Sequence, residues 1–402
     1  MRSAEPVPIT GIGCICSAGH TLNEAMASMF RGERRFGPPS RFRHPLTTDC
    51  PVFAVADGFF VPERFSEPVH VRTVQLALTA AAEALADAGL DRNYLTEKRV
   101  GVCIGTTVGG SVSNQAILGK DEETPVPSLT PDQRFRAANP AVFMAREFGL
   151  SGPIQTIATA CSAGTDAIGL AALWIQSGLC DLVIAGGADE LYEITYNGFY
   201  SLMNSHDGPC RPFDLHRKGL NLGEGAAVMI LESKDALDRR GGRARAHVLG
   251  HGATSDAFHL TSPSPDGKGL RGAVEEAIRT AGIPPSAIAF INAHGTGTPD
   301  NDRIEAELFN DTFPGAPFLS TKGYTGHTLG AAGAVESAFT VAALEGGRIP
   351  ASAGFETPDP DLPAHPASEP TAIHGSAALS ETLAFGGNNS ALIFSLDGTV
   401  SP

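Results

Sequence analysis

Short apolar runs alternate along the chain with longer alanine-rich segments whose apolar residues recur at helical spacing. The short runs have the length of buried strands and include residues 99–110, 180–190 and 287–297. Two of the alanine-rich segments predict helices over 71–90 and 270–283. Strands that alternate with helices in this way are typical of layered α/β folds, so we expect an α/β fold.

Segments in the first part of the chain have counterparts in the second part. A helix that ends on Ala-Gly and leads into a buried strand occurs twice. An alanine-rich helix that begins with small residues and ends on glycine also occurs twice, over 161–178 and 330–347. Such repeats indicate an internal duplication. We expect one half over residues 1–250 and the other over residues 251–402.

Composition fits a globular protein, with 42% hydrophobic and 18% charged residues among 402. The formal net charge of −15 argues against nucleic acid or an anionic membrane as a partner, because both attract basic surfaces. No apolar run approaches the roughly 18 residues that a membrane-spanning helix needs. The N-terminal run is broken by glycines and predicts a buried first strand, not a signal peptide. We therefore expect a cytoplasmic protein.

The seven cysteines are odd in number and scattered, without the spacing of metal ligands or the density of a disulfide framework. We expect reduced thiols and no metal. Most of them have the context of small buried hydrophobic residues, and Cys14 and Cys16 alternate within the expected first strand.

Cys161 differs because glycine, alanine, serine and threonine surround it between an apolar run and a helical pattern, in the sequence "IATACSAGTDAIG". This context predicts a thiol at the N-terminus of a helix. The helix dipole would lower its pKa, and free backbone N–H groups would donate to an oxyanion. On this motif alone, a nucleophile and an inert buried cysteine are equally good interpretations.

Two histidines occur in small-residue contexts near expected strand ends, His294 in "NAHGTGTPDND" and His327 in "KGYTGHTLG". In a duplicated α/β sheet the equivalent strand ends converge, so both imidazoles and the Cys161 thiol are expected in one cavity. Lys322 and Glu336 are interpreted as a buried ion pair that positions His327; the alternative is an exposed lysine and an exposed helical glutamate. The other histidines are taken as structural.

These residues, together with "PITGIG" near the start and "LAFGGNNSALIF" near the end, resemble the β-ketoacyl-(acyl carrier protein) synthases of type II fatty acid and polyketide synthesis. The resemblance covers nearly the whole chain and places it in the thiolase superfamily. It implies a five-layered αβαβα fold built from two similar halves, normally as a dimer.

The resemblance implies that Cys161 attacks an acyl thioester on the phosphopantetheine arm of an acyl carrier protein. His294 and His327 would bind the thioester carbonyl of a malonyl carrier and stabilise the enolate left by decarboxylation, and a His-His pair points to chain elongation. The backbone N–H groups of Cys161 and Phe385 would form an oxyanion hole, with Phe385 as a gate. No metal or free cofactor is expected.

The resemblance also assigns binding residues. Thr296 and Thr298 would hold the pantetheine arm, although a simple turn role would also explain them. Val108 and Phe199 would line the acyl pocket, although both could be ordinary core residues. The expected partners are an acyl carrier protein and a second ketosynthase subunit, in a homodimer or in a heterodimer with a chain-length factor.

The sequence departs from the familiar fatty acid enzymes at Ala384, where glycine is usual, and at Asn388, where threonine is usual. Its motifs are more similar to ketosynthases of aryl polyene and flexirubin-type pigment clusters. Near the helix that would face the carrier, only Arg64 and Arg72 are basic. Carrier docking would then depend on a local patch or on a partner subunit.

Two other classes compete with a condensing enzyme. A thiolase would need a second cysteine near the C-terminus as acid and base, and no cysteine follows Cys210. A non-catalytic chain-length factor would usually have lost the nucleophile, whereas the cysteine and both histidines are present here. The sequence therefore predicts an active elongating condensing enzyme.

Overall fold

The computed structural model describes residues 5–42, 50–59, 71–107 and 138–398. Its main feature is a ten-stranded sheet with the order β3-β2-β4-β5-β1-β6-β12-β11-β7-β8. The first five strands of that order are β3 (Ile154–Ile157), β2 (Val100–Gly105), β4 (Leu182–Asp189), β5 (Gly225–Glu232) and β1 (Val7–Cys16). The other five are β6 (Ala246–Ser255), β12 (Asn388–Ser395), β11 (Ala377–Ala384), β7 (Ile288–Asn292) and β8 (Phe318–Leu319).

The two halves of the sheet have the same topology. From the outer edge inward, β3-β2-β4-β5-β1 matches β8-β7-β11-β12-β6 in strand order and in the direction of every pairing. The halves join where β1 pairs with β6 antiparallel. The duplication expected from the sequence is therefore present. Residue 250, where we expect the first half to end, lies inside β6, which begins at Ala246.

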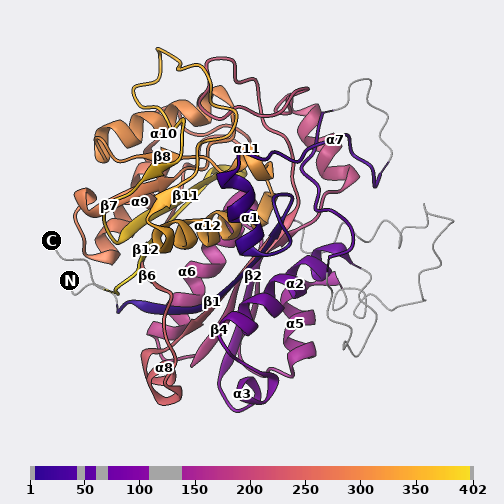
Figure 1. Cartoon of the computed structure of the whole chain (residues 1–402), viewed down its shortest axis with the longest axis vertical. Helices are drawn as coiled ribbons and strands as arrows, with labels where there is room; N and C mark the ends of the chain where they lie inside the picture. The colour runs from indigo at the N-terminus through magenta and orange to yellow at the C-terminus, as the bar shows by residue number, and fades with distance from the viewer. Residues whose placement is uncertain (1–4, 43–49, 60–70, 108–137, 399–402) are drawn as a thin grey trace.

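The helices form three layers around the two halves of the sheet (Figure 1). Helices α6 and α12 lie between them, α2 and α5 cover the outer face of the first half, and α9 and α10 cover the second. The bounds of these helices are α2 (Arg72–Asp87), α5 (Pro140–Phe148), α6 (Ala163–Gln176), α9 (Lys268–Ala281), α10 (Pro299–Thr312) and α12 (Ala332–Gly346). The shorter elements are α1 (Leu22–Phe30), α3 (Arg92–Thr96), α7 (Glu193–Ser201), α8 (Lys234–Arg240), α11 (Lys322–Thr325), β9 (Arg348–Ile349) and β10 (Thr371–Ala372). The arrangement is the five-layered αβαβα fold.

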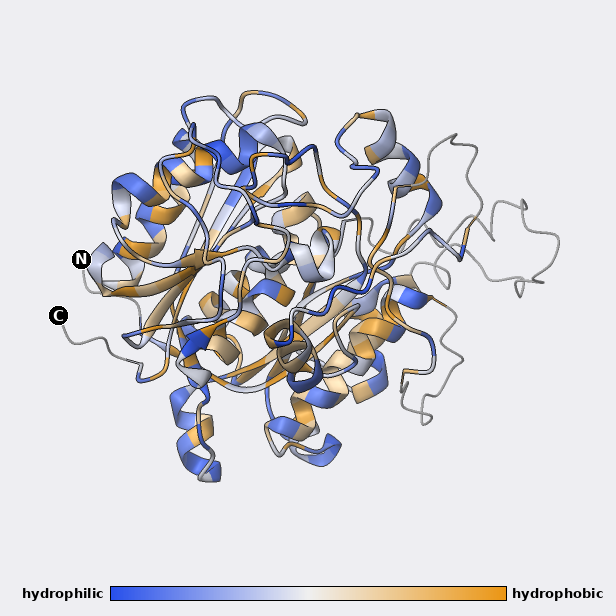
Figure 2. Cartoon of the chain, turned by 45° about the horizontal axis from the view of Figure 1, so that its top comes forward, coloured by the Kyte–Doolittle hydropathy of each residue, from blue (hydrophilic) through white to orange (hydrophobic). Residues whose placement is uncertain are grey.

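Hydrophobic residues concentrate on the strands and on the inner faces of the helices (Figure 2). Helix α9 illustrates the pattern, because Leu270, Ala273, Val274 and Ala277 are buried at helical spacing while Glu275 is exposed. Among the described residues, no helix is long and apolar enough to cross a membrane.

The two central helices approach each other closely because both begin with glycine in their first turns. A Cβ added to Gly164 of α6 would lie 2.8 Å from the Ala334 backbone nitrogen, and one added to Gly333 of α12 would lie 1.8 Å from Thr165 Oγ1. The approach brings the N-termini of α6 and α12 together at the centre of the molecule. Short 3-10 turns precede both helices, at Ala160–Ser162 and Leu329–Ala331.

Candidate active site

Cys161 lies in the turn that joins β3 to α6, as the sequence predicts. Ala160, directly before it, has a φ of +56°, a left-handed conformation that non-glycine residues rarely adopt. Leu329 has the same φ in the matching turn before α12. Gly330 is therefore the residue of the second half that corresponds to Cys161, and of these two turns only the first carries a thiol.

The protonation state of Cys161 depends mainly on burial. Loss of solvent raises the pKa of its thiol to about 11, and the Lys322 charge and the Phe385 backbone N–H act in the opposite direction. Activation of the thiol by the helix N-terminus stays a prediction from the sequence.

The two histidines converge on Cys161. His327 Nε2 lies 3.0 Å from Cys161 Sγ, and the ring centroids of His294 and His327 are 5.1 Å apart with an interplanar angle of 87°. Both imidazoles and the thiol are buried, and their reactive atoms lie within 4.8 Å of one another. The predicted cysteine-histidine-histidine site is therefore assembled from both halves of the fold.

The partners of the imidazoles assign their tautomers. The Leu329 backbone N–H donates to His327 Nδ1 at 3.1 Å, and Lys322 Nζ lies 2.9 Å from His294 Nδ1. Burial lowers the pKa of both imidazoles well below the usual value, and the Lys322 charge acts in the same direction. Both rings are then neutral with the proton on Nε2. Such Nε2–H groups donate hydrogen bonds and have no free lone pair for a metal ion, so the cluster fits an oxyanion better than a cation.

Lys322 positions His294 and not His327, which corrects the sequence-based interpretation. Its Nζ contacts His294 Nδ1 and donates to the His294 carbonyl at 2.6 Å, and it forms the predicted buried ion pair with Glu336. The reason is topological: Lys322 follows β8, which pairs with β7 just before His294. His327 comes after a turn at Gly326 with a φ of +65°, and its backbone N–H donates to the Asn221 carbonyl instead.

The predicted gate and one predicted pocket residue meet above the thiol. The Phe385 ring stacks on Phe199, with centroids 5.2 Å apart at 16°, and Phe199 also contacts the His327 ring edge-on at 6.3 Å. Gly386 has a φ of +83°, which glycine adopts without strain. Val108, the other predicted pocket residue, lies outside the described residues.

The two predicted pantetheine threonines are close together, with Thr296 Oγ1 and Thr298 Oγ1 2.8 Å apart. They line the same cavity as the thiol and the imidazoles, and its volume is about 60 Å³. Its wall is formed by Cys161, Phe199, Asn204, Leu220, Thr261, Ser262, Pro263, His294, Thr296, Thr298, Asn301, His327, Leu383, Ala384 and Phe385.

Buried carboxyl groups behind His294 were missed by the sequence analysis. Glu381 accepts the His294 backbone N–H at 2.9 Å, and Glu305 accepts the Gly295 N–H at 2.9 Å. Burial raises the pKa of both, and raises that of Asp302, which accepts the Gly297 N–H, to about 6. Glu381, inside the apolar run of β11, was the signal that could have revealed them. A glutamate is rarely buried unless it has a partner, so its place in a buried strand indicates a polar network.

Asp189, at the end of β4, was also missed, and it joins the two halves. It accepts the Thr106 hydroxyl at 2.6 Å and the Gly330 backbone N–H at 2.6 Å. Burial raises its pKa to about 6. The carboxyl group thus fixes the turn before α12 against the strand ends of the first half.

Arg72 is not free to bind a partner, which differs from the expectation that it helps to dock the carrier. Its guanidinium forms two hydrogen bonds with buried Glu224, at 2.9 and 2.7 Å, and Arg41 pairs with the same carboxylate. The Arg72 side chain is only 15% exposed. Arg64, the other expected basic residue, lies outside the described residues.

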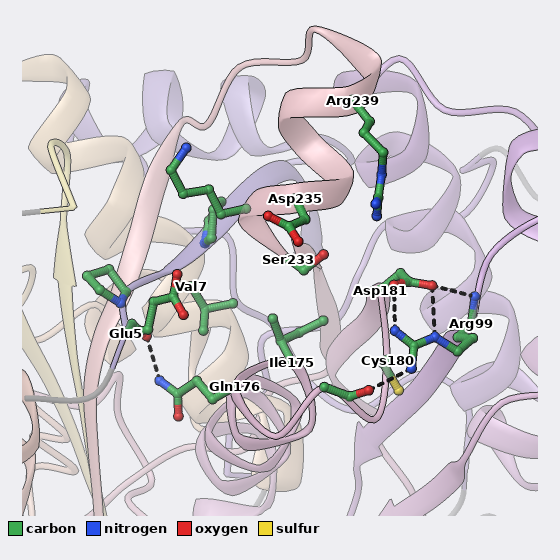
Figure 3. Close-up of a pocket in the computed structure, with 14 residues that line it drawn as sticks. Glu5, Val7, Arg99, Ile175, Gln176, Cys180, Asp181, Ser233, Asp235 and Arg239 are labelled. Carbon is green, nitrogen blue, oxygen red and sulfur yellow. Dashed lines mark hydrogen bonds and ion pairs between the residues drawn. The ribbon is translucent and has the colours of Figure 1, made fainter.

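A larger hollow of about 400 Å³ lies at the other ends of β2 and β4 (Figure 3). There Arg99 pairs with Asp181 at 2.7 Å, and Gln176 donates to the Glu5 carbonyl at 2.7 Å. Cys180 borders this hollow, but no histidine is among the described residues that line it. The cluster of a thiol and two imidazoles around Cys161 has no counterpart among the described residues that line this hollow.

A cysteine and two neutral histidines at the centre of a duplicated five-layered α/β fold fit an acyltransferase that uses a thiol and has the thiolase fold. Comparison with known proteins specifies the family. The description "Beta-ketoacyl synthase, N-terminal domain" matches residues 4–236, and "Beta-ketoacyl synthase, C-terminal domain" matches residues 245–356. The chain belongs to the β-ketoacyl synthase family.

Individual relatives match over nearly the whole chain. The 3-oxoacyl-[acyl-carrier-protein] synthase 2 of Staphylococcus aureus (strain COL) is 36% identical and covers 98% of this chain and 99% of its own length. A solved structure described as "The ishigamide ketosynthase/chain length factor" has a TM-score of 0.89 at 31% identity, covering 98% of this chain and 99% of that one. A type II polyketide synthase acyl-carrier protein in complex with its ketosynthase, AntDE:AntF, has a TM-score of 0.86 at 26% identity, with coverage of 98% and 99%.

Proposed function

We propose that this chain is an elongating β-ketoacyl-(acyl carrier protein) synthase, which joins an acyl group held on Cys161 to a malonyl unit with loss of carbon dioxide. The observation that supports it best is that hydrogen bonds occupy Nδ1 of both imidazoles and so leave the ring proton on Nε2. His294 and His327 both present Nε2–H to the cavity that contains Cys161 Sγ. Two such donors aimed at one carbonyl oxygen stabilise an enolate.

The first half-reaction loads the thiol. Cys161 Sγ attacks the carbonyl carbon of a carrier-bound thioester, while the new oxyanion accepts the backbone N–H groups of Cys161 and Phe385. The carbon–sulfur bond to the carrier arm then breaks, and the proton of the Cys161 thiol passes to the sulfur of the departing carrier arm. The Lys322 charge and the His327 Nε2–H favour the Cys161 thiolate as the thiol proton leaves.

The second half-reaction uses both imidazoles. The malonyl thioester oxygen accepts the two Nε2–H bonds, the bond to the carboxylate carbon breaks, and its electron pair forms the enolate as carbon dioxide leaves. The enolate carbon attacks the acyl carbonyl on Cys161, a carbon–carbon bond forms and Sγ departs as the thiolate. Lys322 keeps His294 Nδ1 as an acceptor, so that the proton stays on Nε2.

The remaining site residues are proposed to hold the substrate. Thr296 and Thr298 would bind the pantetheine arm, because their hydroxyls line the cavity beside His294. Phe385 would swing away from Phe199 to admit the acyl chain, whose pocket would include Phe199 and Val108. Substrates are delivered on carrier phosphopantetheine, so no free cofactor takes part in either half-reaction.

The proposed partners are an acyl carrier protein and a second ketosynthase subunit. The printed descriptions of the similar structures support both, since one is a ketosynthase bound to its acyl-carrier protein and the other a ketosynthase/chain length factor. The choice between a homodimer and a heterodimer with a chain-length factor stays open. The similarity to aryl polyene enzymes and the cytoplasmic location stay predictions from the sequence.

The proposal is tested by intact-protein mass spectrometry. Incubation with an acyl carrier should add one acyl group to the wild-type chain and none to Cys161→Ala. Subsequent addition of a malonyl carrier should release a 3-oxoacyl product on the carrier together with carbon dioxide. An adduct that persists on Cys161→Ala, or a loaded wild-type chain that never extends the acyl group, would reject the proposal.

A further inference from the structure

A polar cluster that neither half-reaction uses lies directly beneath the nucleophile turn. It consists of Thr159, Ser162, Asp166, His251 and Ser390, and we call it the Asp166 cluster. Asp166 Oδ2 accepts the Thr159 hydroxyl at 2.5 Å and the Ser162 hydroxyl at 3.0 Å. Because these two residues stand on either side of Ala160 and Cys161, one carboxylate holds both ends of the turn that carries the thiol.

This turn needs an external restraint. Ala160 has a φ of +56°, and a left-handed non-glycine residue persists only where the surrounding contacts over-determine it. The carboxylate supplies such contacts from the first turn of α6, where the N-terminal end of a helix favours negative charge. The position of Sγ relative to His327 therefore depends on Asp166.

His251 holds the other side of the carboxylate. It comes from β6, in the second half of the fold, and its Nε2 lies 3.2 Å from Ser390 Oγ and at an ion-pair distance of 3.6 Å from Asp166 Oδ1. Asp166 Oδ1 is buried and has no hydrogen-bond partner among the described residues, so His251 is the charged neighbour on that side. Gly169 makes room for the ring, since a Cβ there would lie 2.4 Å from it. Burial opposes ionisation of Asp166, but the nearby His251, Thr159 and Ser390 side chains together lower its pKa, so the group is a carboxylate.

The imidazole also faces a second hollow of about 270 Å³. Glu276 and Thr280 of α9 and Leu173 of α6 line this hollow beside His251. The charged groups that face the ring are therefore Asp166 from α6 and Glu276 from α9, and Ser390 from β12 is its uncharged neighbour.

We propose that Asp166 and His251 are positioning residues for Cys161: Asp166 fixes the turn that aims the thiol, and His251 fixes Asp166. The proposal rests on the proposed function only in taking Cys161 as the nucleophile. It predicts that loss of either residue slows the loading of Cys161 and leaves the two-histidine site unchanged, because neither His294 nor His327 contacts the cluster through any bond found among the described residues.

The test compares the two half-reactions in the same variants. Asp166→Ala and His251→Leu should slow transfer of a labelled acyl group from its carrier to Cys161 by about tenfold or more. Decarboxylation of malonyl carrier in the absence of acyl donor should stay within about twofold of wild type. His251→Gln should restore most of the loading rate, since its side-chain amide can donate toward Asp166. His247→Gln, on the same strand outside the cluster, is the matched control and should load normally.

Asp166→Asn keeps the side-chain size and tests the role of the charge if the alanine variant fails to fold. Loading at the wild-type rate in folded Asp166→Asn and His251→Leu would overturn the proposal, and so would an equal loss of both half-reactions. A wild-type chain that accepts no carrier-bound acyl group would reject the proposed function instead. In that case the rate of Cys161 alkylation by iodoacetamide, located by peptide mapping, still tests the positioning role in the same variants.

Discussion

At the scale of single residues, the tautomers of His294 and His327 fit the malonyl half-reaction proposed for them. We predict that His294→Ala and His327→Ala still load an acyl group on Cys161 but condense about 100- to 1,000-fold more slowly, the usual loss when one oxyanion donor is removed. Rapid-quench measurement of acyl transfer, followed by addition of malonyl carrier, gives both rates for each variant. Near wild-type condensation in either variant would reject the two-histidine enolate site.

Lys322 is predicted to act through His294. Its Nζ holds His294 Nδ1 and the His294 carbonyl, so Lys322→Met should lose condensation to about the same extent as His294→Ala. Because removal of Lys322 alone leaves Glu336 as an unpaired buried carboxyl group, the double variant Lys322→Met, Glu336→Gln should be measured beside it. A double variant that condenses like wild type would show that the ion pair only supports the fold.

The residues of the candidate site could be predicted from the sequence, but some of their hydrogen-bond partners and their burial could not. Cys161, His294 and His327 stand in small-residue motifs at strand ends, and those motifs identify them without coordinates. The partner of Lys322 depends instead on the pairing of β8 with β7, which no local pattern specifies. The burial that raises the pKa of the Cys161 thiol is likewise hidden from the sequence, because it arises only when the layers pack together.

At the scale of elements, the crossing of α6 and α12 requires the absence of a side chain. We predict that Gly333→Val destabilises the fold by roughly 1 to 3 kcal/mol or more, because its Cβ would overlap Thr165 Oγ1 and neither helix can move without displacing the turns before Cys161 and Gly330. Denaturant unfolding of purified variants measures the loss. Gly346→Ala, near the end of the same helix with open space around it, is the control and should be neutral or slightly stabilising.

The helices of the duplicated units were predictable because alanine-rich segments with regular apolar spacing specify them locally. The boundary between the halves was not. It depends on where β6 begins, and β6 is defined by pairing with β1 and β12, which are distant in sequence. The family descriptions divide the chain between residues 236 and 245, in agreement with a second half that begins at β6.

At the scale of the whole molecule, the net charge of −15 and the engagement of Arg72 with Glu224 affect how an acidic carrier protein would approach. We predict that kcat/KM for a carrier-bound acyl substrate rises several-fold as salt increases from about 20 to 200 mM, because ions screen the repulsion between two negative proteins. The control is the same acyl group on free pantetheine, an uncharged fragment whose kcat/KM should hardly change. A fall in kcat/KM with salt for the carrier substrate alone would instead mean that a local basic patch attracts the carrier strongly enough to outweigh the net charge.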